Sequence, residues 1–454
     1  MKIKLHWQIV IALVMGTLVG FLVNNGYGKM EGGKQVLEGA GQSFVNACGY
    51  VGDLFLNALK MIIVPLIFTS IVVGIAGLGK IKGFGKLGAK TVMFYALTSL
   101  LSIVVGLTVV NLIQPGLVNG EPNPDIVKLV EDNKEAYSGD VEKKTAKGQD
   151  TEGFSAVTDI FKRMIPTNIF EAFSDNSRML ALIFVSLLTA FALIFISETG
   201  RNSVLPFLQG VNEIALLITR WIMLFAPFAV FALVGKSVAG LGLDIFGLLG
   251  KYFLTVLAAL AIHLFITLPL ILKFIGKVNP FMHFKAMRNA LLTAFSTSSS
   301  SATLPVTMRG VHERAGVSNR VTSFVLPLGA TVNMDGTALY ECVAVIFVFQ
   351  LLGVDITFGA QFTVVALALL TSIGVAGVPS ASLVAILIIL NNSAIPIDNA
   401  EIFVGLLLAI DRPLDMSRTA VNVFSDSCAA VVVGRLEGED QILKKDPDKI
   451  DDFD

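Results

Sequence analysis

The distribution of apolar and polar positions predicts a chain that crosses a membrane many times. Long apolar runs recur along the sequence, and about 20 consecutive apolar residues are enough for an α-helix to span the hydrocarbon core. We therefore expect eight membrane-spanning helices, at residues 7–23, 44–78, 91–113, 179–196, 211–239, 252–274, 322–352 and 411–435. The run at 44–78 is too long for a perpendicular crossing, so this helix must tilt or extend beyond the bilayer.

Two further apolar segments are interrupted in a way that predicts re-entrant hairpins instead of crossings. Residues 290–306 carry a run of serines at their middle, and basic residues lie on both sides of the segment. Residues 362–390 contain GVAGVPSAS between two arms that are each too short to span alone. Irregular backbone at membrane depth is tolerated only where it is buried in protein or lines a cavity.

The C-terminal half has the order hairpin, interrupted helix, hairpin, polar helix. The interruption is GATVNMDGT, in which Gly329, Asn333, Asp335 and Gly336 would break the helix at 322–352. We interpret this order as one unit repeated in opposite orientation. Interrupted segments at corresponding positions predict a transport site near the membrane midplane. The expected fold is an all-α polytopic membrane protein with eight transmembrane helices, two re-entrant helical hairpins and inverted repeats.

Composition and charge support a membrane protein. The 454 residues are 54% hydrophobic and 15% charged, whereas a soluble chain has about 25% charged residues. The net charge of −1 gives no indication of nucleic-acid binding. Basic residues at 80–90 and 273–288 mark cytoplasmic loops, which predicts cytoplasmic N- and C-termini in a plasma (inner) membrane. The polar segment 117–153 is expected to be a flexible extracellular loop.

A polar stripe lies on the last predicted helix. Its members are three or four residues apart, within an arc of about 80° on one helix face. They are Asp411, Asp415, Arg418, Asn422 and Asp426. Charged residues within membrane helices usually face a cavity or a partner. The Arg418 guanidinium suits a carboxylate and Asp415 suits an ammonium, as an acidic amino acid would need. The alternative is an internal salt bridge of Arg418 with Asp415 or Asp411.

The interrupted segments add further candidate ligands. Asn333, Asp335 and the free carbonyls of the broken helix are oxygen donors that suit sodium, the alternative being a kink with capped ends. The serine run at 298–301 and the glycines of GVAGVPSAS could bind an anion through amide donors, or serve in helix packing. His263 lies in an apolar helix, where a packing or bundle-facing role competes with a proton relay. Neither the cysteines nor the histidines have the spacing of a disulfide framework or a metal site.

Together these motifs resemble the glutamate/aspartate transporter family, the sodium:dicarboxylate symporters, which also includes neutral amino acid exchangers. The resemblance rests on SSSSATLPVTM, NMDGTALYE, GVAGVPSAS and DRPLDMSRTAVNVFSD, and extends to FLNALKMIIVPLIFTSIVVGIAGL. It implies a homotrimer with a static scaffold, a mobile transport domain that moves like an elevator, and the second hairpin as extracellular gate. The implied divisions are scaffold helices at 1–90, a transport-domain helix at 91–116, a polar loop with its lead-in at 117–178, scaffold helices at 179–240 and the transport core at 241–454.

The resemblance also implies substrate-binding residues by motif position. Arg418 is similar to the residue that holds the side-chain carboxylate of the substrate, and Asp415 to the one that holds its ammonium. Further substrate contacts are implied for Asn422, Thr419, Thr337, Ser300 and the backbone of Val378.

Three sodium sites and a proton carrier are implied in the same way. The first sodium site has Tyr95, Thr98, Ser99, Asn333 and Asp335. The second has Gly329, Asn422 and Asp426. The third has Thr331, Met334 and the backbone of Ser372, Ile373 and Val375. Glu341 matches the proton-carrying glutamate of the mammalian members, the alternative being a neutral glutamate hydrogen-bonded in the core. Where acidic-substrate members often carry an extra arginine, this chain has Ser298 and Met416, a departure that bears on potassium counter-transport.

The expected function is sodium-driven symport of L-glutamate or L-aspartate with proton co-transport, and not catalysis. The expected partners are the acidic amino acid, sodium, membrane lipid and other copies of the chain. The proton and potassium are further candidate ions. Sodium is the expected cofactor, and no organic cofactor is expected. The nearest alternatives are neutral amino acids or C4-dicarboxylates as substrates. An intramembrane serine hydrolase would need a nucleophile held by a base, for which no motif is present, and a dedicated ion channel is the remaining class.

Overall fold

The computed structural model describes residues 5–31, 34–76, 84–118, 120–122, 162, 164–174, 178–241, 245–354, 357–374, 381–392 and 397–447. Six helical stretches within these ranges are long and apolar enough to cross a membrane: Trp7–Tyr27, Ala40–Ala76, Lys86–Ile113, Glu198–Leu224, Phe246–Phe274 and Asn319–Leu352. Shorter apolar helices are Ala181–Phe195, Ala226–Gly240 and Gly359–Ser372. The prediction of a mainly helical, polytopic membrane protein is confirmed.

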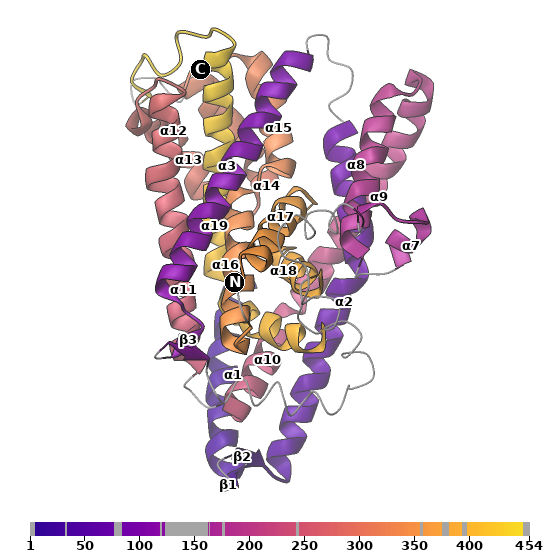
Figure 1. Cartoon of the computed structure of the whole chain (residues 1–454), viewed down its shortest axis with the longest axis vertical. Coiled ribbons are helices and arrows are strands. Elements are labelled where there is room, and N and C mark those ends of the chain that lie inside the picture. The colour runs from indigo at the N-terminus through magenta and orange to yellow at the C-terminus, as the bar shows by residue number, and fades with distance from the viewer. Residues whose placement is uncertain are drawn as a thin grey trace.

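Four helices of the N-terminal part coincide with predicted crossings. They are α1 (Leu5–Tyr27), α2 (Ala40–Ala76), α3 (Phe84–Ile113) and α8 (Met179–Phe195). With 37 residues, α2 is about 55 Å long, which exceeds the hydrocarbon core of about 30 Å. Figure 1 shows α1 and α2 extending together to one end of the molecule, while the short helix α7 (Ile169–Ser174) lies beside α8.

The prediction of a single crossing at 211–239 is wrong. The structure has two helices there, α9 (Glu198–Leu224) and α10 (Ala226–Leu241). Pro227 explains the interruption, because proline lacks the N–H of the helical ladder and disfavours helical conformation at the preceding residue. α9 also begins well before residue 211, at a point where the Ser197 side chain caps the helix by accepting from the amide of Gly200.

Two short β-hairpins depart from the predicted all-α fold. β1 (Gly28–Glu31) pairs antiparallel with β2 (Lys34–Leu37), and β3 (Leu117–Val118) with β4 (Glu121–Pro122). Strands of four and two residues are too short for their alternation to be recognised in a sequence. β3 and β4 form the start of the polar segment 117–153, and the rest of that segment lies outside the described residues.

Glycine allows α1 to pack closely against α10. A Cβ atom at Gly16 would lie 2.7 Å from the carbonyl oxygen of Phe231, and one at Gly20 would lie 2.6 Å from that of Gly235. Small residues spaced four apart let membrane helices approach at backbone distance, where dispersion contacts drive their association. α2 packs on α8, α9 and α10, which makes these helices one connected group.

The C-terminal half follows the predicted order of elements. They are α11 (Ile245–Ile262), η2 (His263–Thr267), α12 (Leu268–Phe274), α13 (Pro280–Thr297), α14 (Ser300–Arg309), η3 (Gly310–Arg314), α15 (Asn319–Val332), α16 (Asp335–Leu352), α17 (Phe358–Gly374), α18 (Ala381–Asn392) and α19 (Ile397–Leu436). η2 is one π-helical turn within the continuous stretch Phe246–Phe274, the crossing predicted at 252–274. α19 has 40 residues and starts before the predicted residue 411, because the apolar residues ahead of the polar stripe continue the helix.

Packed helix pairs lie at the positions of the two predicted hairpins, and the predicted helix break is present. α13 and α14 pack together and turn at Ser298, whose φ of 51° lies in the left-handed region. α17 and α18 form the second pair, and residues 375–380 at its tip lie outside the described residues. α15 ends at Val332 and α16 begins at Asp335, so the break falls within NMDGT.

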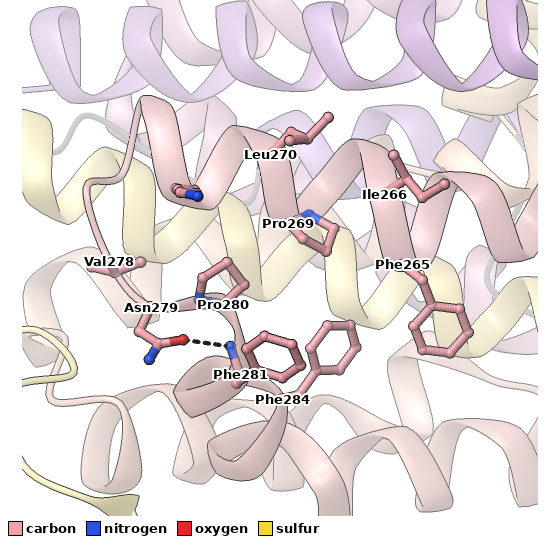
Figure 2. Close-up of a pocket in the computed structure, with 10 residues that line it drawn as sticks. Phe265, Ile266, Pro269, Leu270, Val278, Asn279, Pro280, Phe281 and Phe284 are labelled. Carbon is pink, nitrogen blue, oxygen red and sulfur yellow. Dashed lines mark hydrogen bonds between the residues drawn. The ribbon is translucent and has the colours of Figure 1, made fainter.

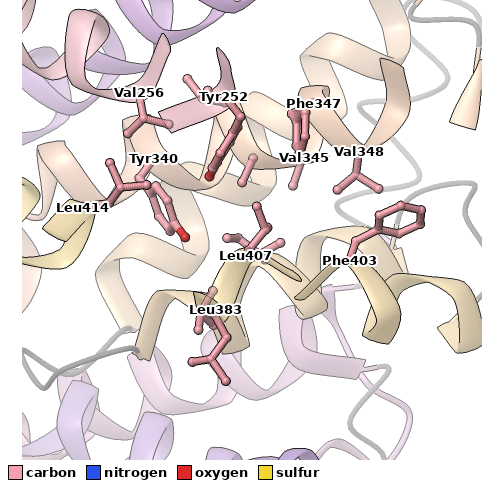
Figure 3. Close-up of a cluster of buried hydrophobic side chains, with 14 of the residues drawn as sticks. Tyr252, Val256, Tyr340, Val345, Phe347, Val348, Leu383, Phe403, Leu407 and Leu414 are labelled. Atoms are coloured by element: carbon pink, nitrogen blue, oxygen red, sulfur yellow. The ribbon is translucent and has the colours of Figure 1, made fainter. Parts of the chain in front are cut away.

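α16 is the centre of the fold. All of its residues from Asp335 to Leu351 are buried, and it contacts α3, α11, α17, α18 and α19. Figure 3 shows Tyr340 and Phe347 of this helix in one cluster with Tyr252 of α11 and Phe403 of α19. A helix buried on all sides is normally hydrophobic all round, so the polar residues of α16 require partners in the interior.

Candidate functional site

The polar stripe of α19 faces the interior of the protein. Its five members, at positions 411, 415, 418, 422 and 426, have relative exposures between 1% and 4%. α19 packs against α13, α15, α16 and α18. The stripe therefore contacts the break between α15 and α16, where free backbone groups and polar side chains are concentrated.

Arg418 is held by two carboxylates of its own helix. Its Nη2 atom lies 2.6 Å from Oδ1 of Asp415, and its Nη1 atom lies 3.2 Å from Oδ1 of Asp411. The guanidinium lies over the ring of Tyr340, 4.5 Å from the centroid, and the Tyr340 hydroxyl donates to Asp411. Arg412 contributes a second cation, 3.4 Å from Asp415. The internal salt bridge that the sequence left as an alternative is thus present in this structure, and two guanidinium groups face two carboxylates.

Asn422 joins α19 to the start of α16. Its Oδ1 atom accepts from the amide of Gly336 at 2.8 Å, and its Nδ2 atom donates to the hydroxyl of Thr337 at 3.1 Å. The first amides of a helix have no partner within it, so Asn422 satisfies one of them. A Cβ atom at Gly336 would lie 2.7 Å from the carbonyl oxygen of Arg418. Only glycine permits this approach of the two helices.

A second group of polar contacts surrounds Asp335, directly after the helix break. Its Oδ1 atom accepts from Ser99 at 2.7 Å and from Thr98 at 3.3 Å. Its Oδ2 atom accepts from Ser425 at 2.5 Å and lies 3.3 Å from Nε2 of His263. Burying a carboxylate is strongly unfavourable unless hydrogen-bond donors surround it. α3, α19 and η2 provide these donors from three directions.

Asn333 connects this group to Asp426. Its Nδ2 atom donates to Oδ1 of Asp426 at 2.9 Å, and the Thr98 hydroxyl lies 3.4 Å from its Oδ1 atom. The Asp426 carboxylate and the Tyr95 hydroxyl both lie against Gly329 of α15, where a Cβ atom would collide with both. The first implied sodium set and two members of the second therefore form one contiguous cluster. We call it the Asp335 cluster, and it consists of Tyr95, Thr98, Ser99, Gly329, Asn333, Asp335 and Asp426. The described contacts of Asn422 are with Gly336 and Thr337 instead.

The third implied set is not brought together by the described contacts. Thr331 donates to the carbonyl of Leu328, Ser372 donates to the carbonyl of Leu369, and Met334 packs with Ala385 of α18. The backbone of Ile373 belongs to the last turn of α17, and Val375 and Val378 lie outside the described residues.

Three other assigned positions are buried. Thr419 donates to the backbone carbonyl of Asp415 at 2.7 Å, and Ser300 is the first residue of α14. Glu341 is fully buried on α16, where its Oε2 atom accepts from Thr371 of α17 at 2.8 Å. Among the described residues, the Oε1 atom of Glu341 has no hydrogen-bond partner.

Besides Arg412 and Thr371, further contact residues were not assigned from the sequence. Ser425 and Ser102 bind the side chain and the backbone carbonyl of Asp335, His263 contacts its carboxylate, and Tyr340 stacks on Arg418. Single serines in apolar helices are typical of helix packing, so only their spacing next to Ser99 and Asp426 could have indicated a site. His263 faces the helix bundle, where it is fully buried and contacts Asp335.

The two groups differ in the ligands that they can bind. The Asp335 cluster contains carboxylate, amide and hydroxyl oxygens, which are the donors preferred by hard cations. The second group, which we call the Arg418 group, consists of Asp411, Arg412, Asp415, Arg418 and Tyr340. It places a guanidinium beside carboxylates, so it can recognise an anionic and a cationic part of one small molecule. The two groups share α16 and α19 and lie one to two helical turns apart on each.

A model of the sodium:dicarboxylate symporter family matches residues 5–436. The chain is 36% identical over 441 residues to the proton/sodium-glutamate symport protein of Geobacillus stearothermophilus, with 96% of each chain covered. It is 30% identical over 436 residues to the proton/glutamate-aspartate symporter of Escherichia coli (strain K12), with 96% and 93% covered. It is also 33% identical over 470 residues to excitatory amino acid transporter 3 of Oryctolagus cuniculus, with 96% and 86% covered. This chain therefore belongs to the sodium:dicarboxylate symporter family.

Proposed function

We propose that this chain is a secondary active symporter that takes up L-glutamate or L-aspartate together with sodium and a proton. Its family consists of symporters, so the chain is a transporter and not an enzyme. Relatives named for proton/sodium-glutamate and glutamate-aspartate symport support the substrate class. The observation that carries the proposal is Arg418, a buried guanidinium between two carboxylates on a helix that faces the protein interior.

In this proposal, substrate binding replaces the ion pair between Arg418 and Asp415 with two ion pairs to the substrate. The side-chain carboxylate of the substrate binds Nη2 of Arg418, and Asp415 then binds the substrate ammonium. Asp411 and Tyr340 keep the guanidinium oriented from the other side. Leaving one partner of a buried pair unpaired costs about 3–5 kcal/mol, so a ligand must satisfy both groups at once. An amino acid with an acidic side chain does so. Asn422, Thr337 and Ser300 would contact its main-chain carboxylate and the surroundings of that group. Thr419 and the backbone at Val378 would line the same pocket.

Sodium ions are the second substrate, and the Asp335 cluster is their proposed binding region. The hydroxyls of Thr98 and Ser99 and the carboxylate of Asp335 would exchange their hydrogen bonds with one another for sodium coordination. The carboxylate of Asp426 would do the same with its bond from Asn333. Three sites are proposed, with the residues assigned by motif position. Support for the first site, and for Gly329 and Asp426 of the second, comes from their contiguity in the Asp335 cluster. Asn422 of the second site and the whole third site rest on the family resemblance.

Coupling between sodium and substrate would pass through the first turn of α16. Asp335 belongs to the Asp335 cluster. The amide of the next residue, Gly336, donates to Asn422, and Gly336 lies against the backbone of Arg418. A ligand that orders one group therefore fixes the backbone on which the other depends. By linkage, each ligand then raises the affinity for the other by the same factor.

Glu341 is the proposed proton carrier. Among the described residues, Glu341 accepts one hydrogen bond and its second oxygen has no donor. A buried carboxyl in such surroundings is more stable when it holds a proton. The movement itself is proposed to follow an elevator mechanism in a homotrimer. α1, α2 and α8 to α10 would form the scaffold, and α3 and α11 to α19 the transport domain, with both termini cytoplasmic in the plasma (inner) membrane.

The test is uptake of labelled substrates into proteoliposomes under imposed sodium, proton and potassium gradients. Arg418→Ala should reduce glutamate and aspartate uptake about 100-fold, because it removes charge-assisted bonds of about 3 kcal/mol. Sodium should still raise the thermal stability of this variant. Arg309→Ala, at an exposed arginine of α14, is the matched control and should transport normally. Wild-type glutamate uptake by Arg418→Ala would overturn the assignment.

Neutral amino acids are a second candidate substrate class. In this structure Arg418 is already neutralised by Asp411 and Asp415, and Asp411 alone could keep it paired. Asp415 would then hold the ammonium of a substrate without a side-chain carboxylate. Sodium-driven serine uptake that exceeds glutamate and aspartate uptake would establish this alternative. A C4-dicarboxylate lacks the ammonium and would leave Asp415 without its cation, so uptake of labelled succinate is expected to be absent.

A further inference from the structure

An apolar groove of about 920 Å³ lies on the outer surface between η2–α12 and α13, and its lining includes no residue of the Asp335 cluster and not Arg418. Figure 2 shows Phe265, Ile266 and Leu270 along one side of it, and Phe281 and Phe284 along the other. Phe265 and Phe281 are 63% and 79% exposed. Phe284 stacks on Phe265, with ring centroids 5.8 Å apart, and on Phe424 of α19 behind it at 4.2 Å, so the floor of the groove is anchored in the core.

The groove has a charged end and an apolar end. Lys273 lines it at the last turn of α12, and Lys277 follows in the exposed turn before α13. Phe265 lies eight residues before Lys273 on the same membrane-length stretch, about 12 Å deeper at 1.5 Å per residue. The residues that line the groove are all described, and none of them is acidic.

This polarity matches an amphiphile in a bilayer. α12 ends at Phe274, which places Lys273 at the level where a membrane helix meets the head groups, while Phe265 and Ile266 lie in the hydrocarbon region. Lysines at this level attract anionic lipids, with about a fivefold gain in binding for each basic residue. A groove that binds a polypeptide would not need its basic residues at one end only, whereas a groove that binds a phospholipid would.

We propose that the groove binds a single phospholipid with an anionic head group, whose phosphate lies on Lys273 and Lys277 and whose acyl chain lies along Phe265, Leu270 and Phe281. The site is independent of the transport groups, because none of its lining residues belongs to the Asp335 cluster or to the Arg418 group. It is also independent of which substrate is transported.

Native mass spectrometry of the purified full-length protein tests this proposal with phosphatidylglycerol and phosphatidylcholine of identical chains. The wild type should retain phosphatidylglycerol at least about fivefold better than phosphatidylcholine, as expected for one or two lysines. Lys273→Gln should lower this preference about fivefold, whereas Lys445→Gln, at an exposed lysine of the C-terminal segment, should leave it unchanged. Phe281→Ser should weaken binding of both lipids equally, which assigns the apolar part to the acyl chain.

Three results would overturn the proposal. Equal retention of the two lipids by the wild type would mean unspecific annular lipid only. An equal loss of preference in Lys273→Gln and Lys445→Gln would mean a general charge effect. A shift of the measured mass from oligomer to monomer in Phe281→Ser would mean that the groove is an interface between copies of the chain.

Discussion

At the scale of single residues, two buried acids on α16 have different surroundings although they are close in sequence. Asp335 accepts hydrogen bonds from Ser99 and Ser425 and lies beside His263, whereas Glu341 accepts one bond, from Thr371. Hydrogen-bond donors stabilise a buried carboxylate charge, and a carboxyl group without them is more stable when protonated. The same side-chain chemistry can therefore serve a cation at one position and a proton at the other.

Glu341→Gln should make uptake insensitive to an imposed pH gradient while sodium-driven uptake continues. Glutamine has the shape of the protonated acid and keeps the bond with Thr371, but it cannot release a proton. Initial rates in proteoliposomes at equal sodium gradient, with and without a pH gradient of one unit, measure the effect; the wild type should respond up to about tenfold, the ratio of proton concentrations. Glu313→Gln, at an exposed glutamate, should behave like the wild type. An unchanged pH response in Glu341→Gln would exclude the proton-carrier role.

At the scale of helices, the start of α16 and the middle of α19 are held at backbone distance. Gly336 makes this possible, and Asn422 then bonds to the amide of Gly336 and to Thr337. Both bonds depend on the absence of a side chain at one position. The contact joins the Asp335 cluster to the Arg418 group, so we expect a change at Gly336 to affect stability and the proposed transport site together.

Gly336→Ala should destabilise the protein by about 1–3 kcal/mol, because the new methyl group would lie 2.7 Å from a carbonyl oxygen of α19. Thermal unfolding in detergent measures the loss, and glutamate-dependent stabilisation should fall with it. Gly250→Ala is the matched control, since a Cβ atom at Gly250 of α11 would have no neighbour within 4 Å. Alanine is favoured over glycine in a helix by about 1 kcal/mol, so the control should be neutral or more stable. Equal stability of both variants would contradict the close contact.

The ends of three helices meet at Glu437, just after α19. Its carboxylate lies 2.6 Å from Nζ of Lys90 on α3 and 3.5 Å from Arg320 at the start of α15. The hydrogen bond from Lys90 holds the pKa of Glu437 below its ordinary range, with smaller contributions from the charges of Lys90, Arg320 and Lys86. A lowered pKa means that the pair stabilises the fold above the ordinary glutamate pKa and that this contribution is lost as the pH falls through the lowered value.

Glu437→Gln should therefore lower the free energy of unfolding by about 0.5–1 kcal/mol at pH 7, the upper range for an exposed ion pair. The difference between variant and wild type should disappear at acidic pH and shrink in high salt. Thermal unfolding at pH 7 and at acidic pH, with and without added salt, tests this. A difference that stays constant across pH would show that packing and not charge is responsible.

At the scale of the whole molecule, the proposed elevator requires α15 to move past α2. These helices touch at Gly74 and Thr331, where a Cβ atom on Gly74 would lie 3.3 Å from Cβ of Thr331. That separation is close to the Cβ–Cβ distance of a disulfide, about 3.5–4.5 Å. The contact crosses the boundary between the proposed scaffold and the proposed transport domain.

Gly74→Cys combined with Thr331→Cys should form a disulfide on mild oxidation and lose uptake, and reduction should restore it. The three native cysteines are buried and unpaired, so a background with alanine at Cys48, Cys342 and Cys428 is needed. Thr331→Cys alone measures any direct effect on sodium binding. Full uptake by the oxidised, cross-linked protein would contradict movement across this boundary.

The sequence by itself determined the membrane class, most of the crossings, both hairpins, the break at NMDGT and the polar stripe of α19. These features are local, because apolar length, helical periodicity and helix-breaking residues act over a few turns of chain. The family motifs added the assignment of site residues, since they record positions together with their roles. The short strands and the break before α10 were missed, because their signals are too short or rest on a single proline.

Only the tertiary structure decided which polar groups meet. Ser99 and Asp335 are 236 residues apart, and Ser425 reaches the same carboxylate from a third helix. Periodicity places Arg418 on a face but does not show that Asp411, Asp415 and Tyr340 already satisfy it. Such pairings depend on how buried helices pack, because each buried charge must find its partners among groups brought together by folding.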